Sequence, residues 1–485
     1  MDILNEAHFR QSEYNTRRHF LKKCVTGMGA VTLGSVMGGA DLFAKSLLPS
    51  GGGAGMPHFV PKAKHVIYLH MAGAPSQLEL FDYKPELQKM NGQSCPPSLL
   101  EGKRFAFIRG VPQMLGPQSN FKQYGESRTW VSDYLPRFSE VADEVTFLKS
   151  VHTDEFNHAP AQFLMQTGSP RTGRPSLGGW VTYGLGSPNE NLPGFVVLLS
   201  AGGPTGGKRL WGSGFLPTVH QGVQCQSTGT PVQNLKNPKG VDSKMRKKSV
   251  DIINKINELE YQEAQDPEIL TRISQYEMAF KMQTSVPKVM NIDSEPDYIQ
   301  EMYGVTPGKN SFANNCLLAR RLVENGVRFV QLYDDGWDMH GAGPGGGVGD
   351  GLKRKCKQID KPISALLMDL KQRGMLEDTL VVWGGEFGRT PMMEARTGKN
   401  FLGRDHHNEA FTMWMTGGGI KRGHTHGETD EIGYSAISGK VHVHDIQATI
   451  LNQLGLDHER LTYRFQGRDF RLTDVHGNVI KDILA

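Results

Sequence analysis

The chain of 485 residues has a hydrophobic content of 38%, a charged content of 21% and a formal net charge of +4. These values exclude an intrinsically disordered protein and describe a globular chain, long enough for one large domain or about two to three ordinary ones. So small a charge on a chain of this length gives no indication of a nucleic-acid partner.

The N-terminus carries the pattern of an export signal. Arg17 and Arg18 stand together, two large apolar residues follow, and a mildly apolar, glycine-rich run extends to Phe43. The paired arginines are typical of export through the twin-arginine translocase, and the run is too weakly apolar to predict a stable membrane span. We therefore expect a signal peptide over 1–44, a linker over 45–64 and a periplasmic or extracellular mature protein.

From residue 65 onward, short apolar runs alternate with helical patterns. This rhythm predicts a central, mainly parallel sheet with helices on both faces. A charged segment over 237–285, with apolar residues at helical spacing, indicates a helical excursion from the main domain. Further along, Asp360 followed by Pro362 predicts the start of a helix. The expected strands are His65–Met71, Val145–His152, Gly194–Leu199, Val327–Tyr333, Leu380–Trp383 and Phe411–Met415.

The cysteines show no short metal-binding spacing. An oxidising compartment would permit disulfides, although Cys316 lies inside a predicted helix and is expected to be a buried thiol. The sequence leaves the pairing open among Cys95, Cys225, Cys316 and Cys356.

Polar residues follow the first two strands. His70 and Ser76 lie at the end of the first strand, and His152 and His158 lie between the second strand and a helix. The start of a helix attracts an anion through its free N–H groups and its dipole, and the same dipole lowers the pKa of an imidazole. His70, Ser76 and His152 are candidates for substrate binding, with a structural role as the alternative.

Three later stretches also end expected strands, and each includes a carboxylate. Because the carboxyl ends of parallel strands meet at one edge of a sheet, these groups are expected to converge there. Their oxygen and nitrogen atoms suit Zn²⁺, Mn²⁺, Mg²⁺ or Ca²⁺, and the sequence does not choose among these ions. Arg389 could hold an anion by its guanidinium fork or form a salt bridge with Glu386. The three pairs are Asp338 and His340, Glu386 and Arg389, and Asp405 and His406.

Several motifs together resemble a sulfatase-like family called domain of unknown function 1501. They include ELFDYKP, HAPAQFLMQTGSP, GWDMHG, VVWGGEFGRTP and GRDHHNEAF, and the resemblance covers 65–485. The family is similar to the alkaline phosphatase and sulfatase superfamily. The resemblance therefore implies an alkaline phosphatase-like α/β sandwich, with a mainly parallel central sheet and a metal site at its carboxyl edge.

Carried over residue by residue, the resemblance implies metal-binding roles for Asp338, His340, Glu386 and His406, with Asp405 beside His406. His158 falls where a sulfatase has its Cys or Ser nucleophile, so a covalent sulfatase mechanism is not implied. Three roles stay open for His158: nucleophile, general acid or metal ligand, with a helix-capping histidine as the alternative to all of them.

Two functional expectations follow. The first is an exported, metal-dependent hydrolase of sulfate or phosphate esters, acting on an anionic small molecule or an anionic polysaccharide, with His158 and Arg389 in catalytic roles. The second is a non-catalytic protein of the same fold that binds an anionic glycan or carries a metal ion.

Overall fold

The computed structural model describes residues 55–233, 235–394 and 401–485. The expected signal peptide over 1–44, and the expected linker up to residue 54, lie outside the described residues.

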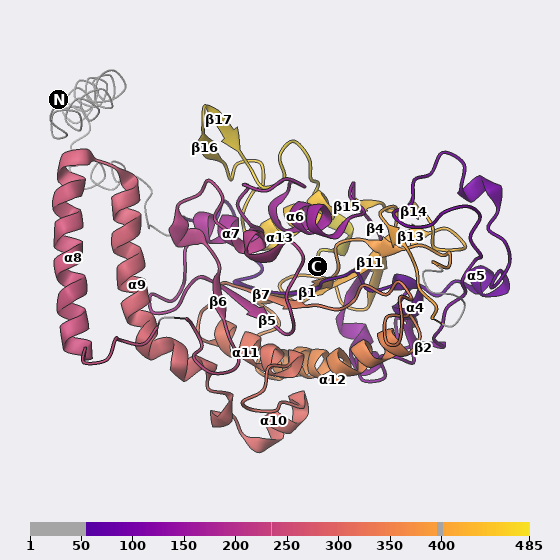
Figure 1. Ribbon diagram of the computed structural model, residues 1–485, viewed down its shortest axis with the longest axis horizontal. Helices are drawn as coiled ribbons and strands as arrows, with labels where there is room; N and C mark the ends of the chain where they lie inside the picture. Colours follow the sequence, from indigo (N-terminus) through magenta and orange to yellow (C-terminus); the bar gives the residue numbers. More distant parts are fainter. Residues whose placement is uncertain (1–54, 234, 395–400) are drawn as a thin grey trace. The chain divides into compact units, whose positions relative to one another are not determined.

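A nine-stranded sheet forms the centre of the fold (Figure 1). All its strand pairs are parallel except those that β11 makes with β4 and β8. The expectation of a mainly parallel sheet is therefore confirmed. The strand order is β12 (His424–His426), β4 (Thr146–His152), β11 (Phe411–Thr416), β8 (Thr379–Gly384), β1 (His65–Met71), β7 (Phe329–Asp334), β5 (Phe195–Leu199) and β6 (Val223–Cys225), and β15 (Val441–His442) also pairs with β4.

The central strands are buried on both faces. In β1, Ile67 and Leu69 join one apolar core, while Val66 and Tyr68 join a second core on the other face. Alternate side chains of a strand point to opposite faces, so a continuous apolar run is what a sheet covered on both sides requires.

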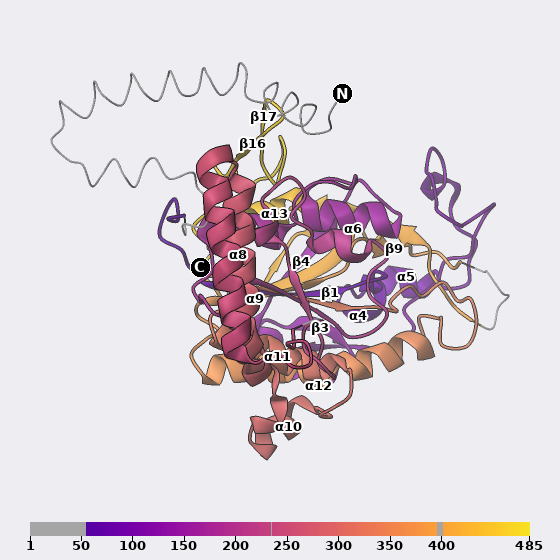
Figure 2. The same ribbon diagram turned by 60° about the vertical axis from the view of Figure 1, so that its left-hand side comes forward.

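Helices cover both faces of the sheet, as Figures 1 and 2 show. One face carries α6 (His158–Thr167), α7 (Leu177–Leu185) and α13 (Val443–Gln453), and the other carries α11 (Phe312–Glu324) and α12 (Asp350–Gln372). This arrangement confirms the expected α/β class with helices on both faces.

A long helical hairpin lies within the segment for which the sequence indicates a helical excursion. It consists of α8 (Ser243–Ala264) and α9 (Pro267–Met290), and α9 continues five residues beyond the expected end. The side chains of Asp242 and Asp266 accept hydrogen bonds from backbone N–H groups in the first turns of these helices, which explains where each helix begins.

Smaller elements fill the loops between the main strands. They are α4 (Gln77–Leu80), α5 (Pro85–Lys89), α10 (Asp297–Tyr303), the 3₁₀ helices η1 (Pro97–Leu99), η2 (Phe138–Glu144), η3 (Gly207–Trp211), η4 (Thr218–His220), η5 (Ile292–Ser294) and η6 (Lys481–Ile483), and the strand pairs β2 (Phe121–Tyr124) with β3 (Thr129–Ser132), β9 (Gly388–Arg389) with β10 (His406–His407), β13 (Glu428–Thr429) with β14 (Ala436–Ser438), and β16 (Tyr463–Phe465) with β17 (Arg468–Phe470).

The prediction that Asp360 begins a helix is wrong. Asp360 and Pro362 lie inside α12, which begins at Asp350. The Asp360 carboxylate instead accepts hydrogen bonds from the backbone N–H groups of Arg137 (2.9 Å) and Phe138 (2.7 Å), at the start of η2. The Asp does cap a helix, but one that lies more than two hundred positions earlier in the chain.

All four described cysteines are free thiols buried in the protein, including Cys316 inside α11. Within the described residues, every helix is too short or too polar to cross a membrane.

Candidate metal centre

Separate segments bring the candidate residues to one edge of the sheet. Asp338 and His340 follow the end of β7, Glu386 follows the end of β8, and His158 is the first residue of α6, which follows β4. His406 enters differently, because it precedes β11 and does not follow a parallel strand.

The expectation that Asp405 and His406 follow the end of a parallel strand is therefore wrong, because these residues precede an antiparallel strand. Phe411, the first residue of the antiparallel strand β11, pairs with Val151 near the carboxyl end of β4. An antiparallel strand begins where its parallel neighbours end, so the stretch before β11 reaches the same edge. There His406 of β10 pairs with Arg389 of β9.

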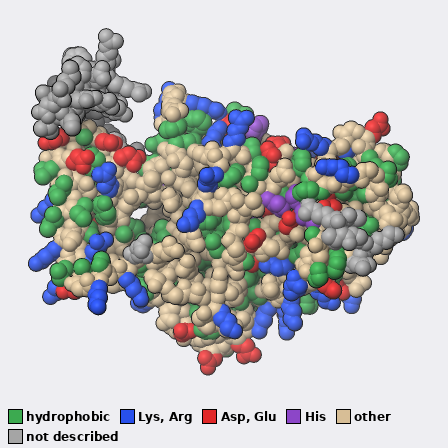
Figure 3. All heavy atoms as spheres, in the orientation of Figure 1, with side chains coloured by type: hydrophobic (Ala, Val, Ile, Leu, Met, Phe, Trp, Pro, Cys, Tyr) green, Lys and Arg blue, Asp and Glu red, His purple; other side chains and the backbone are tan. Residues whose placement is uncertain are grey.

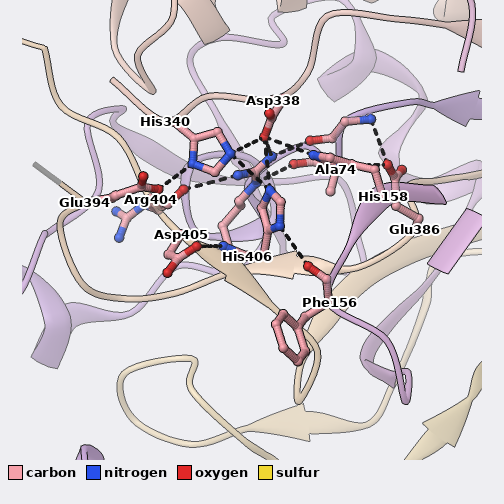
Figure 4. A network of polar contacts seen from close by, with 12 residues as sticks. Ala74, Phe156, His158, Asp338, His340, Glu386, Glu394, Arg404, Asp405 and His406 are labelled. Atoms are coloured by element: carbon pink, nitrogen blue, oxygen red, sulfur yellow. Dashed lines mark hydrogen bonds and ion pairs between the residues drawn. The ribbon is translucent and has the colours of Figure 1, made fainter. Parts of the chain in front are cut away.

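Four side chains form a compact cluster that we name the edge cluster: His158, Asp338, His340 and His406 (Figure 4). Each offers one nitrogen or oxygen atom, and these atoms all lie within 4.8 Å of one another. Asp338 Oδ1 lies 3.2 Å from His158 Nε2, 2.7 Å from His340 Nε2 and 3.3 Å from His406 Nε2. The Nε2 atoms of His340 and His406 are 3.0 Å apart.

Each of the three rings is oriented through its other nitrogen. His158 Nδ1 lies 2.8 Å from Glu386 Oε1, His340 Nδ1 bonds to Glu394, and His406 Nδ1 lies 2.7 Å from the carbonyl oxygen of Phe156. Carboxylate and carbonyl oxygens only accept, so these contacts assign the ring hydrogens to Nδ1 in the neutral imidazoles. The Nε2 lone pairs then point inward, as in a metal site with oriented histidine ligands.

Glu386 is not a member of the edge cluster but contacts one of its residues, His158. It is fully buried, and its Oε1 accepts hydrogen bonds from the Gln162 side chain (2.8 Å) and the Gly73 backbone N–H (3.0 Å) as well as from His158. Its Oε2 lies 3.3 Å from His70 Nε2. Burial opposes ionisation, but hydrogen bonds from His158 and His70 hold the pKa of Glu386 below its usual range. The structure thus places Glu386 as an orienting carboxylate.

Asp405 lies outside the edge cluster but forms a second candidate metal group with His340 and Glu394, whose donor atoms also lie within 4.8 Å of one another. One of its oxygens accepts hydrogen bonds from the backbone N–H groups of Phe107 (2.7 Å) and Ile108 (2.8 Å), and the other accepts from the backbone N–H of His406 (2.8 Å). Asp405 therefore fixes the loop over 100–110 against the cluster.

Arg389 is held inside the protein. It is fully buried, and its Nε and Nη1 donate to the carbonyl oxygens of Ala74 (2.9 Å) and Arg404 (3.1 Å). Its Nη2 contacts Asp338 Oδ1 at 2.6 Å and the carbonyl oxygen of Gly73. The fork that could hold an anion is occupied in this way, and the arrangement positions Asp338.

Charge and burial act in opposite directions on the cluster. Burial opposes protonation of His158, but its hydrogen bonds with Asp338 and Glu386 raise the pKa of His158 to about 9. The expected lowering by the helix dipole is therefore overridden by the two carboxylates. Burial also opposes ionisation of Asp338, yet hydrogen bonds from the three histidines and the charge of Arg389 lower the pKa of Asp338 far below its usual range. Burial lowers the pKa of His406 to about 4.

The three candidates for substrate binding lie away from the open side of the cluster. His70 is fully buried behind Glu386, and Ser76 is 2% exposed at the N-cap position of α4. His152 stacks edge-on against His442, with ring centres 5.2 Å apart, and does not join the edge cluster. Asp154 bonds to His442 at 3.2 Å, so Glu386 and not Asp154 orients His158.

A cavity of about 570 Å³ adjoins the cluster, lined mainly by the loop over 100–110 and by Phe156 and Asn157. Phe107 of this loop packs edge-on against the rings of His340 (5.0 Å) and His406 (5.3 Å). The cavity lining includes Lys103, Arg104 and Arg109. The Asp338 side chain is 40% exposed, so the cluster is open to solvent at this residue. On the face drawn in Figure 3, histidine side chains lie at the surface beside acidic ones.

Sequence reasoning missed Glu394, Gln162 and the basic loop over 100–110. Glu394 bonds to His340, from which it is separated by 54 positions, and it follows no strand of the main sheet. Gln162 had a usable signal, because it lies one helical turn after His158 and thus on the same face of α6.

The fold and the site define a class: an α/β protein with a candidate divalent-metal centre of histidines and one aspartate at the carboxyl edge of a mainly parallel sheet. The sequence model of the family described as "Protein of unknown function (DUF1501)" matches residues 63–484, and the chain belongs to this family. The resemblance given by the motifs is thereby confirmed.

Solved structures that resemble this one include a sulfatase and a member of the alkaline phosphatase superfamily. The PsFucS1 sulfatase from Pseudoalteromonas sp. is 12% identical with a TM-score of 0.38, covering 87% of this chain and 72% of that chain. A protein in the alkaline phosphatase superfamily from Vibrio parahaemolyticus is 10% identical with a TM-score of 0.32, covering 85% and 71%.

The phosphonate monoester hydrolase SpPMH from Silicibacter pomeroyi is 13% identical with a TM-score of 0.30, covering 81% of this chain and 73% of that chain. No curated protein matches the sequence.

Proposed function

We propose that the protein is a metal-dependent hydrolase of sulfate or phosphate esters. The observation that carries this proposal is the edge cluster itself. Three imidazole nitrogens and one carboxylate oxygen converge, and each imidazole is oriented by an acceptor on its other nitrogen. Such a donor set, with its orienting partners, is the chemistry of a divalent-metal centre.

The donor set favours Zn²⁺ over Mg²⁺ or Ca²⁺, which prefer oxygen ligands. In a tetrahedral zinc site with bonds of about 2.0–2.1 Å, ligand atoms lie roughly 3.3 Å apart. The distances from Asp338 Oδ1 to the three Nε2 atoms are 2.7 to 3.3 Å. The residues present therefore fit a zinc ion, which would take the place of the proton that His158 shares with Asp338.

When bound, such an ion supplies Lewis-acid chemistry, which polarises a sulfuryl or phosphoryl oxygen. The chain's own residues prepare the site. His158, Asp338, His340 and His406 would hold the ion, and Arg389 fixes Asp338 Oδ1, which all three histidines contact. Glu386, Glu394 and the Phe156 carbonyl keep the rings oriented.

The loop over 100–110 is the part best suited to bind the substrate. Phe107 covers two of the imidazole rings and limits the access of water to them. Arg104 and Arg109 line the adjoining cavity and would attract an anionic sugar or a small anionic ester, while Lys103, also in the lining, pairs with Glu409 at 2.6 Å. His158 serves as a ligand in this proposal and not as the nucleophile.

A non-catalytic role is the second candidate, and one observation favours it. The position at which the resemblance implies a nucleophile is His158, and both of its ring nitrogens face carboxylates. The protein would then carry the metal or bind an anionic glycan without cleaving it.

The test combines metal content with a substrate screen. Elemental analysis should find zinc in the purified protein, and aryl sulfates and aryl phosphates should be hydrolysed with a rate that chelation abolishes and Zn²⁺ restores. Asp338→Asn removes a metal ligand. The variant should bind one equivalent of zinc less than the wild type, and its rate of hydrolysis should be at least about 100-fold lower. His220→Gln, in η4 and outside the edge cluster, is the matched control and should keep both.

His158→Gln and His158→Ser separate the two candidates. If His158→Gln folds, keeps its zinc and hydrolyses as the wild type does, the ligand role is wrong. If zinc is present but neither ester class is hydrolysed, and His158→Ser gains phosphatase activity, the wild-type protein is the non-catalytic one.

We also propose that the chain is exported by the twin-arginine pathway and that the mature protein starts near Lys45. Support comes from the paired arginines ahead of a glycine-rich apolar run, in a segment outside the described residues. Replacing Arg17 and Arg18 by Lys should retain the precursor in the cytoplasm, as judged by cell fractionation. Unchanged recovery of mature protein outside the cytoplasm would contradict the proposal.

A further inference from the structure

We propose a second divalent-metal site, formed by His424, His426 and Asp482 at the opposite edge of the sheet. Asp482 Oδ2 lies 3.0 Å from His424 Nε2 and 2.8 Å from His426 Nδ1, and one donor atom from each residue falls within 4.8 Å of the others. Two imidazoles thus converge on a single carboxylate oxygen, with spacings close to those between ligands of one ion.

The strand explains the pairing of the two histidines. His424 and His426 are two positions apart in β12, so their side chains project from the same face of the strand. The side chains are 30% and 16% exposed, and that of Asp482 is 55% exposed. The cluster is therefore open enough for an ion to enter and for water to complete its coordination.

The C-terminal segment presents Asp482 to this strand. The backbone N–H of Lys421 donates to the carbonyl oxygen of Ile483 (2.9 Å), and the backbone N–H of Ala485 donates to that of Gly419 (3.0 Å). Lys421 Nζ donates to the carbonyl oxygen of Asp482 (2.6 Å) and lies 4.0 Å from its Oδ1, which leaves Oδ2 to face the two rings. These bonds place the carboxylate before any ion binds.

This site cannot share an ion with the edge cluster. In the register of β12 with β4, His424 pairs with Thr146 and His426 with Leu148, at the amino end of β4. The edge cluster lies beyond the carboxyl end, after His152. Thr146 and His152 are six positions apart in β4, which corresponds to about 20 Å at roughly 3.3 Å per residue.

Two imidazole nitrogens and one carboxylate oxygen suit Zn²⁺, with water in the remaining position. An aspartate side chain is ionised at neutral pH, so Asp482 can serve as an anionic ligand. An ion bound here would tie the C-terminal segment to β12. We infer a stabilising site rather than a second catalytic one, because the cavity that we assign to the substrate lies beside the edge cluster.

The experiment measures zinc binding to the full chain in a background without the first site. Asp338→Asn protein is stripped with a chelator and titrated with Zn²⁺ against a competing chromophoric chelator. We expect the stripped protein to bind about one equivalent of zinc in this titration, and we expect Zn²⁺ to raise the thermal midpoint of the protein. Adding His424→Ala and His426→Ala should remove both effects, while adding His476→Ala, an exposed histidine outside the site, should leave both unchanged.

Asp482→Asn provides a second variant in the same background, because it keeps the size of the side chain while removing its charge. It should weaken zinc binding at least about tenfold. If the Asp338→Asn protein binds no zinc, or if it binds zinc equally well with and without His424 and His426, the proposal is wrong. Neither result depends on ester hydrolysis, so the outcome is independent of the proposed function.

Discussion

Glu386 and Glu394 show how single buried residues determine the properties of the edge cluster. Each carboxylate bonds to the Nδ1 of one histidine and so directs the Nε2 of that ring toward Asp338. Glu386 is fully buried and Glu394 is 3% exposed. Both therefore act inside the protein, out of reach of a substrate.

We expect Glu386→Gln to lower the affinity for zinc by about 10–100-fold while the protein stays folded, because loss of the charge weakens the hold on the His158 ring. Glu394→Gln should act in the same way through His340. The measurement is a competition titration with Zn²⁺ on chelator-treated protein. Glu377→Gln changes a 76%-exposed carboxylate that pairs with Arg422 and serves as the control. Equal affinities in all the variants would show that the orienting contacts do not matter.

The candidate metal ligands could be predicted from the sequence more fully than the residues that orient them. Asp338, His340 and His406 could be predicted because each belongs to a short polar motif beside an apolar run, which Asp338 and His340 follow and His406 precedes. Glu394 could not, because its contact with His340 forms only when the chain returns across the sheet edge. For Arg389 the sequence leaves open an anion-binding role and a salt bridge with Glu386. Its burial among the carbonyl oxygens of Gly73, Ala74 and Arg404 has no local sequence signal and could not be predicted.

At the scale of elements, the strands could be predicted because a sheet buried on both faces needs uninterrupted apolar runs. The direction of β11 could not be predicted, because a buried strand has the same apolar pattern whether it is parallel or antiparallel to its neighbours. Asp360 is a similar case: Asp-x-Pro is typical of a helix start, but the capping bonds go to η2, a different part of the chain.

Asp360→Ala tests this long-range cap. Asp360 is 5% exposed, so the change leaves the N–H groups of Arg137 and Phe138 without their acceptor. We expect a loss of roughly 1–3 kcal/mol in the free energy of unfolding, the usual cost of a buried N–H group left without a charged partner. Asp350→Ala, at the exposed first turn of the same helix, should cost less than about 1 kcal/mol. Thermal unfolding followed by circular dichroism compares the two, and similar shifts would contradict the capping role.

At the scale of the whole molecule, the two edges of the sheet carry different chemistry. The carboxyl edge gathers the ends of the parallel strands and the start of β11, and there the edge cluster forms. The amino edge receives the C-terminal segment, which completes the proposed second site. A third group of histidines, His442, His444 and His476, lies at the start of α13, and we expect it to make the stability of the fold sensitive to pH.

His444 carries this prediction. It is 4% exposed, and its ring stacks on His476 with centres 5.0 Å apart. Burial, followed by the nearby rings of His442 and His476, lowers the pKa of His444 to about 4. The folded protein thus favours the neutral ring, whereas the unfolded chain takes up a proton near the ordinary value of about 6.5. The contribution of His444 to the free energy of unfolding is fully present above about pH 6.5. It falls by on the order of 2–3 kcal/mol as the pH falls toward 4.

The variant His444→Gln tests this. Its side chain keeps a donor for the carbonyl oxygen of Gly168, which His444 Nε2 approaches at 3.3 Å, but it cannot titrate. The thermal midpoint of the variant should therefore fall less than that of the wild type between pH 7 and pH 4.5. Parallel curves for the two proteins would show that His444 does not contribute to the acid sensitivity of the fold.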